Sequence, residues 1–75
     1  IGILKRKIES VTGSSVIEIN LINYLKRSNG IKELEKAIKN YPSISQSILQ
    51  NSRDISNPVG LLFYIAKNKV EPPIS

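Results

Sequence analysis

The chain contains no cysteine, histidine, methionine or tryptophan, and its aromatic residues are limited to three tyrosines and one phenylalanine. Without cysteine or histidine, disulfide bonds, the usual zinc sites and the Ser/His and Cys/His catalytic pairs are excluded. Long hydrophobic runs are also lacking, since none approaches the roughly 20 apolar residues of a membrane span. We therefore expect no metal, no other cofactor and no membrane partner.

What the chain does contain suits one small globular core. Its 75 residues are 40% hydrophobic, and the apolar residues are mostly isoleucine and leucine. A domain of this length buries only about 60% of its unfolded surface, so a partner could contribute to its stability. We expect a single domain over residues 1–75. Because the first residue is Ile1 and not methionine, we also expect it to be a fragment of a larger protein.

Charge is biased to one sign, with 11 Lys and Arg against 6 Asp and Glu and a net charge of +5. A basic domain favours an anionic partner, which is nucleic acid, an acidic protein surface or, as the least favoured of the three, a membrane surface. Lysine-rich helical proteins also reach such charges without binding a polyanion, so the charge leaves both alternatives open.

Apolar spacing of three and four residues predicts helices along the whole chain. The first is expected from Gly2 to Val11, ending at Thr12-Gly13-Ser14. A capping box at Ser15–Glu18 is expected to open the second, which runs to about Arg27. It is apolar around most of its circumference and should be mostly buried. Asn29-Gly30 should then end it, because glycine tolerates the left-handed conformation.

A third helix is predicted from Ile31 to about Asn40, where Pro42 should stop it. Ser43-Ile44-Ser45-Gln46 reads as a second capping box that opens a short fourth helix. The two helices resemble a DNA-reading helix-turn-helix in outline, and the candidate base contacts are Ser45, Gln46, Ser47 and Gln50. An ordinary helical hairpin is the alternative, because Lys39-Asn40 and Ser47 depart from the motif's turn glycine and apolar packing position.

The last predicted helix has the fullest set of start and stop signals. Asn57 suits the N-cap and Pro58 the first helical position, while Pro72-Pro73 should end a helix that reaches Val70. Its wide apolar stripe predicts a central position in the fold. Together these segments predict an all-α compact bundle of about five short helices.

Catalytic residues are not evident. Most of the acidic residues have a simple structural role as a cap, a dipole partner or a solvated charge, and Glu33 and Glu35 do not share a helix face. No glycine-rich phosphate loop occurs. We therefore expect a protein that is not an enzyme.

Basic residues form a scattered footprint that includes Lys32, Lys36 and Lys39. Lys5-Arg6-Lys7 ranks first among candidate phosphate contacts, because cations near a helix N-terminus have little structural reason to be there. Tyr24 and Phe63 are predicted core residues, whereas Tyr41 and Tyr64 could stack on bases. The predicted nucleic-acid-binding residues are Lys5, Arg6, Lys7, Lys26, Arg27, Arg53, Lys67, Lys69, Gln46 and Tyr64.

The segment from Asn57 to Pro73 resembles part of known replication proteins. Its Asn57-Pro58-x-Gly60-Leu61-Leu62 start and its closing Pro72-Pro73 are similar to a helix in plasmid and phage replication initiators related to the DnaD helical domain. Helical accessory domains of plasmid primases are a comparable match. The resemblance implies a DNA-replication role, with DNA and other replication proteins as partners.

The sequence thus predicts a DNA-binding accessory domain of a replication protein, initiator-like or primase-associated, that contacts DNA mainly through phosphates. The alternative is a protein-interaction module that does not touch DNA, for which an exposed patch of Ile and Leu would be the sign. Since no secretion signal follows the basic residues at 5–7, we expect a cytoplasmic protein.

Overall fold

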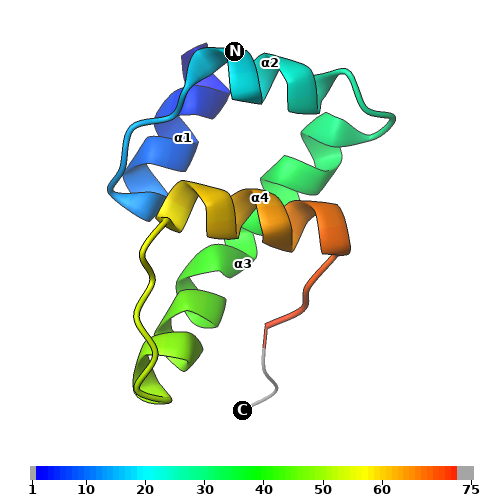
Figure 1. Ribbon diagram of the computed structural model, residues 1–75. Helices are drawn as coiled ribbons and strands as arrows, with labels where there is room; N and C mark the ends of the chain where they lie inside the picture. The colour runs from blue at the N-terminus through cyan, green and yellow to red at the C-terminus, as the bar shows by residue number, and fades with distance from the viewer. Residues whose placement is uncertain (1, 73–75) are drawn as a thin grey trace.

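Four α-helices and no strand make up residues 2–72, which are the residues that this computed structural model describes. The helices are α1 (Gly2–Thr12), α2 (Glu18–Leu25), α3 (Gly30–Gln50) and α4 (Pro58–Asn68). In Figure 1, α4 crosses the middle of α3, with α1 beside them and α2 closing one end. The predicted all-α class is confirmed, but the number of helices is four and not five.

The difference lies at Pro42, which does not stop a helix but sits inside α3. A proline within a helix costs about 3 kcal/mol, because it removes one hydrogen bond and crowds the preceding turn. Packing offsets that cost, since Leu34, Ala37, Tyr41 and Ile44 form one continuous buried stripe on both sides of the proline. Ser43–Gln46 is therefore no capping box, and the Ser45 hydroxyl instead donates to the Pro42 carbonyl at 3.1 Å.

A continuous α3 also removes the helix-turn-helix, which needs a turn between two helices. Gln46 is exposed on the C-terminal half of α3, so it does not belong to a separate recognition helix. The sequence already carried the relevant signal, because the apolar spacing passes through Pro42 without a change of phase.

The core is formed mainly by α1, α3 and α4. Its fully buried large side chains are Ile8, Leu21, Leu34, Leu62 and Ile65. The helix α3 packs against each of the other three, whereas α4 packs chiefly against α3 and α1. The last helix is thus well buried, as predicted, but α3 is the element on which the others assemble.

The start of α4 follows the predicted capping chemistry. The Asn57 side chain accepts a hydrogen bond from the Gly60 backbone N–H at 3.0 Å, and Pro58 lies at the first helical position. A Cβ on residue 60 would lie only 2.6 Å from the Asn57 amide nitrogen. The close capping side chain thus gives a structural reason for glycine at residue 60.

The end of α4 differs from the prediction. The helix ends at Asn68, not at Val70, and Lys69 takes the left-handed conformation that terminates it. Pro72 lies three residues farther on in non-helical chain, so the prolines are not the stop. Pro73 falls outside the described residues.

The second helix is the least covered part of the fold. Leu21 is its buried residue, while Ile17 and Ile19 are 63% and 58% exposed. The expectation that this helix is mostly buried is wrong. The Ser15–Glu18 capping box is also wrong, because Ile17 is the N-cap and makes no side-chain hydrogen bond there. In the connection before α2, Glu9 of α1 accepts a hydrogen bond from the Val16 N–H at 3.0 Å.

A close corner joins α2 to α3. Asn29, not Gly30, holds the left-handed conformation there, with φ 63°. Gly30 is needed for a different reason, since a Cβ on it would lie 2.7 Å from the Tyr24 carbonyl oxygen. Glycine therefore permits α2 and α3 to approach at this corner.

Among the described residues, none of the helices has both the length and the apolar character that crossing a membrane requires.

Candidate nucleic-acid interface

A groove of about 390 Å³ lies between the first half of α3 and the end of α4. We call it the basic groove, because three lysines from two helices line it: Lys32 and Lys36 from α3, and Lys69 from the end of α4. Its other lining residues are Asn29, Glu33, Ala37, Asn40, Ile65, Ala66 and Val70. Its size is at the lower end of the roughly 300–1,000 Å³ typical of ligand sites.

The helix α3 supplies one wall through a polar stripe. Asn29, Lys32, Lys36 and Asn40 recur at three- and four-residue steps, so they lie along one side of the helix. Ala37 is buried beside them, and its small side chain leaves room for the groove. Since α3 begins at this groove, the positive end of its dipole adds to the field of the lysines.

The end of α4 supplies the other wall. The Val70 N–H donates to the Ile65 carbonyl at 3.0 Å, which closes the helix in the manner of a Schellman motif. Lys69 has φ 52° and ψ 44° at the position where glycine is preferred. A non-glycine residue there costs about 1 kcal/mol. Lys69 therefore makes this backbone conformation less favourable than glycine would.

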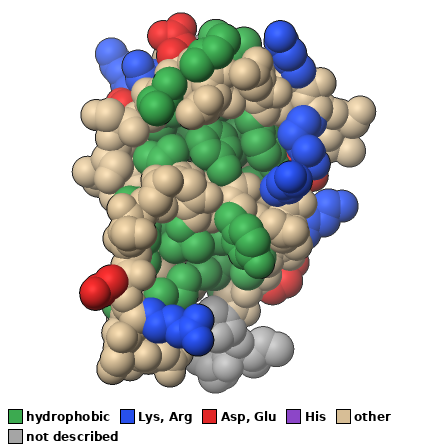
Figure 2. Space-filling model, in the orientation of Figure 1, with side chains coloured by type: hydrophobic (Ala, Val, Ile, Leu, Met, Phe, Trp, Pro, Cys, Tyr) green, Lys and Arg blue, Asp and Glu red, His purple; other side chains and the backbone are tan. Residues whose placement is uncertain are grey.

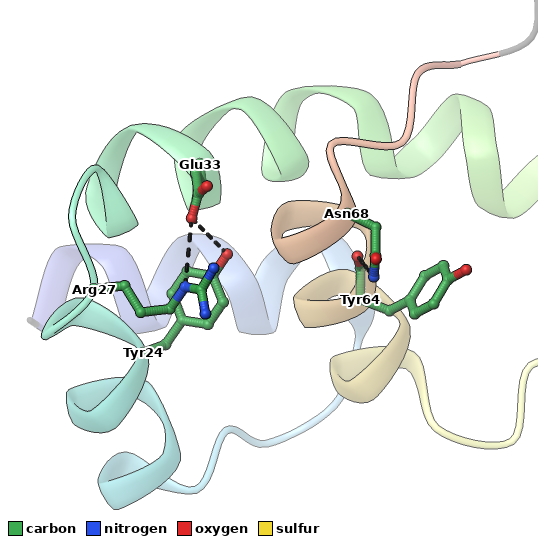
Figure 3. Close-up of polar contacts among 5 residues, drawn as sticks. All are labelled: Tyr24, Arg27, Glu33, Tyr64 and Asn68. Carbon is green, nitrogen blue, oxygen red and sulfur yellow. Dashed lines mark hydrogen bonds and ion pairs between the residues drawn. The ribbon is translucent and has the colours of Figure 1, made fainter.

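A cluster of Tyr24, Arg27 and Glu33 borders the basic groove (Figure 3). The Tyr24 hydroxyl donates to Glu33 Oε1 at 2.9 Å, and Arg27 Nε lies 3.7 Å from the same oxygen. The Arg27 guanidinium also lies over the Tyr24 ring, 5.3 Å from its centre. Arg27 therefore neutralises the one carboxylate among the lining residues, and the lysines dominate the charge of the groove.

Burial, with the hydrogen bond to Glu33 as a second cause, raises the pKa of Tyr24 to about 12. The ring itself packs on Phe63 of α4, with ring centres 5.4 Å apart. The predicted core role of Tyr24 is thus combined with a polar one. At Tyr41, which is 5% exposed, burial alone raises the pKa of the phenol.

Glu71 supplies a second carboxylate at the edge of the basic groove. Its Oε1 lies 2.8 Å from Lys36 Nζ, and both side chains are more than half exposed. An exposed pair of this kind contributes little to stability. It does place a carboxylate on a groove lysine, where a phosphate oxygen could replace it.

The ten residues predicted from the sequence are spread over the molecule. Of these, Lys69 lines the basic groove, and Arg27 contacts it through Glu33. Lys67 and Tyr64 are exposed on α4, and Lys26 directly follows α2. Arg53 lies in the connection between α3 and α4, remote in sequence from the groove-lining segments. Lys5, Arg6 and Lys7 lie on α1, and none of them lines the basic groove.

Figure 2 shows where these charges gather on one face. Several Lys and Arg side chains follow the right-hand edge of the view, over the end of α2, the start of α3 and the end of α4, while others lie at the upper left and near the lower edge. The C-terminal part of the chain thus contributes to the same basic edge as the middle part.

Lys32 and Lys36 were part of the general basic footprint but not of the predicted contacts. Their four-residue spacing, shared with Asn29 and Asn40 at either end, was the signal that could have selected them. That signal carries no information about Lys69, which reaches the same groove from a helix far along the chain.

Within residues 2–72, no group of three or more acidic side chains is arranged to hold a metal ion. Comparisons with protein-family models, with curated proteins and with solved structures give no match to this chain. Its candidate site must therefore be interpreted from its own geometry.

Proposed function

We propose that the chain is a DNA-binding helical accessory domain of a replication protein and that the basic groove is its phosphate-binding surface. The observation that carries this proposal is the convergence of Lys32, Lys36 and Lys69 on one groove from two helices. Lysine ammonium groups bind phosphate oxygens as point charges and do not distinguish bases, so the binding is largely independent of sequence.

Two further features support binding of phosphates at this groove. Lys69 occupies a backbone conformation in which glycine would cost less, and strained positions of this kind cluster at functional sites. Asn29 and Asn40 add neutral side-chain amides to the same groove, which can donate to phosphate oxygens. The replication context rests on the resemblance of the segment from Asn57 to Pro73.

Salt dependence of DNA binding tests the proposal. Affinity for a short labelled duplex is measured by fluorescence anisotropy between about 50 and about 200 mM salt, since each phosphate contact adds about 0.9 to the slope. The triple variant Lys32→Gln/Lys36→Gln/Lys69→Asn is expected to reduce the slope by about 3. Asparagine is used at residue 69 because it tolerates the left-handed conformation.

The matched control removes the same charge from α1, as Lys5→Gln/Arg6→Gln/Lys7→Gln. We expect a much smaller change in slope for this variant. A flat and weak response of the wild type would exclude phosphate-driven binding. A larger loss in the α1 variant would move the contact surface to residues 5–7, and a loss confined to one DNA sequence would indicate base readout.

A further inference from the structure

A second groove, of about 260 Å³, lies on another side of α3, where α1 begins and α2 ends. Its lining is apolar except at two positions, and we call it the apolar groove. Ile3 and Leu4 come from α1, Leu25 from α2 and Ile31 from α3, while Lys7 and Glu35 are the charged members. Ile3 is 75% exposed and Ile31 is 55% exposed.

Exposed isoleucines occur on each of the three helices that line the apolar groove. Of the large hydrophobic side chains that are exposed among the described residues, Ile3, Ile17, Ile19 and Ile31 belong to α1, to α2 with its N-cap, and to the start of α3. Figure 2 also shows hydrophobic side chains at the surface over α2. Gathered apolar surface of this kind marks interaction sites, whereas single exposed residues are ordinary.

The apolar groove suits side chains of a protein partner better than a free small molecule. Its volume is below the roughly 300 Å³ at which small-molecule sites begin, and it has no set of converging polar groups. Ile3 and Lys7 are one helical turn apart on α1, and Ile31 and Glu35 are one turn apart on α3. Four residues of a helix rise about 6 Å, which matches two apolar side chains of a helix at positions i and i+4.

Charge decides which helix fits. Of the lining residues, Lys7 on the α1 side is basic and Glu35 on the α3 side is acidic. A second copy of this chain would bring like charges together in a molecule whose net charge is +5. An acidic partner is attracted by the same charges.

We infer that the apolar groove binds an acidic amphipathic helix of another protein. Two apolar side chains one turn apart enter between α1 and α3, and an acidic side chain of the partner faces Lys7. This gives Lys7 a role that the basic groove does not. It does not depend on DNA binding, because Lys32 and Lys36 line the other groove.

The probe is a synthetic helical peptide with leucines at i and i+4 and glutamates on the remaining face. Its matched counterpart carries lysines in place of the glutamates. Binding is measured by calorimetry, and amide shifts of the labelled protein locate it. We expect the acidic peptide alone to bind, with the largest shifts at residues 3–7, 25 and 31–35.

Variants locate the contact. Ile3→Ser/Ile31→Ser should weaken binding by at least about tenfold, since two apolar contacts are lost. Leu49→Ser is the control, because Leu49 is 56% exposed at the other end of α3. It should leave binding unchanged, as should Lys32→Gln/Lys36→Gln/Lys69→Asn.

Three results would overturn the inference. The first is absence of binding by the acidic peptide, and the second is equal binding of the lysine peptide. The third is a wild-type dimer in sedimentation that Ile3→Ser/Ile31→Ser dissociates, which would make a second copy the occupant. Loss of DNA binding in the salt experiment would not affect any of these results, so the two proposals fail separately.

Discussion

The first half of α3 separates two grooves of opposite character. Lys32 and Lys36 line the basic groove that α4 closes, whereas Ile31 and Glu35 line the apolar groove that α1 and α2 close. Neighbouring helical residues point about 100° apart, so a shift of one position moves a side chain from one groove to the other. A charged helix face can therefore serve two surfaces with different partners.

The two grooves also differ in the contacts that fix the helices around them. On the basic side, the Tyr24–Arg27–Glu33 cluster and the contact of Tyr24 with Phe63 tie α2, α3 and α4 together. On the apolar side, Ile3 and Ile31 lie largely in solvent. The basic groove is thus largely preformed, whereas the apolar groove gains buried surface only when a partner covers it.

The largest expected effect comes from the corner that both grooves share. Gly30→Ala places a Cβ 2.7 Å from the Tyr24 carbonyl oxygen and 3.3 Å from Leu25 Cα. We expect a loss of about 2 kcal/mol in the free energy of unfolding, measured with urea. Gly2→Ala is the control, because a Cβ there meets nothing within 4 Å. Equal stability of the two variants would show that the corner does not need the close approach.

A smaller effect is expected from Tyr24→Phe, which removes the hydrogen bond to Glu33 and should cost about 1 kcal/mol at neutral pH. The variant should also change the dependence of stability on pH. The pKa of Tyr24 rises from 10.0 to about 12 on folding, so the unfolded chain loses this proton first. Rising pH therefore favours unfolding between these two values.

Urea unfolding at several pH values between 10 and 12 measures this effect. The wild type should lose stability faster than Tyr24→Phe over this window. Tyr41, whose pKa burial also raises, is present in both proteins and cancels in the difference. Parallel curves would show that Tyr24 does not hold its proton more firmly in the folded state.

The smallest expected effect comes from two glycine variants that distinguish the charge of Lys69 from its backbone conformation. Lys69→Gly relieves the left-handed strain and should stabilise the protein by about 0.5 kcal/mol, while the salt slope of DNA binding falls by about 1. Lys67→Gly removes the same charge inside α4 and should destabilise by about 1 kcal/mol. A lower free energy of unfolding for Lys69→Gly would show that the left-handed conformation of Lys69 is not strained.

Local signals predicted the fold class correctly, and they placed the starts of α1, α3 and α4 to within one residue. The start of α4 at Asn57 and Pro58 and the end of α1 at Thr12 follow from the chemistry of a few adjacent residues. Pro42 was misread because its cost is local, whereas the burial of Tyr41 and Ile44 that offsets it comes from packing against other helices. A helix thus continues through a local stop signal when the buried stripe of its side chains extends beyond that signal.

The candidate site was harder to predict than the helices. The excess of basic residues is evident from composition, but their grouping is not, because Lys69 is 33 residues or more from Lys32 and Lys36 along the chain. The exposure of Ile17 and Ile19 was also not predictable from the sequence, and both were expected to be buried. Their hydrophobicity indicates burial, and only the arrangement of α2 against its neighbours leaves them exposed.

The sequence by itself determined that the chain is helical, basic and free of the residues on which the usual zinc sites, disulfides and histidine-based catalysis depend. These are properties of residue types and of spacings within one or two helical turns. Tertiary structure alone decided that α3 is continuous, that its lysines meet Lys69 at one groove, and that Ile3 and Ile31 line a second groove. Those features depend on which helix faces come together, and that is set by the packing of the whole core.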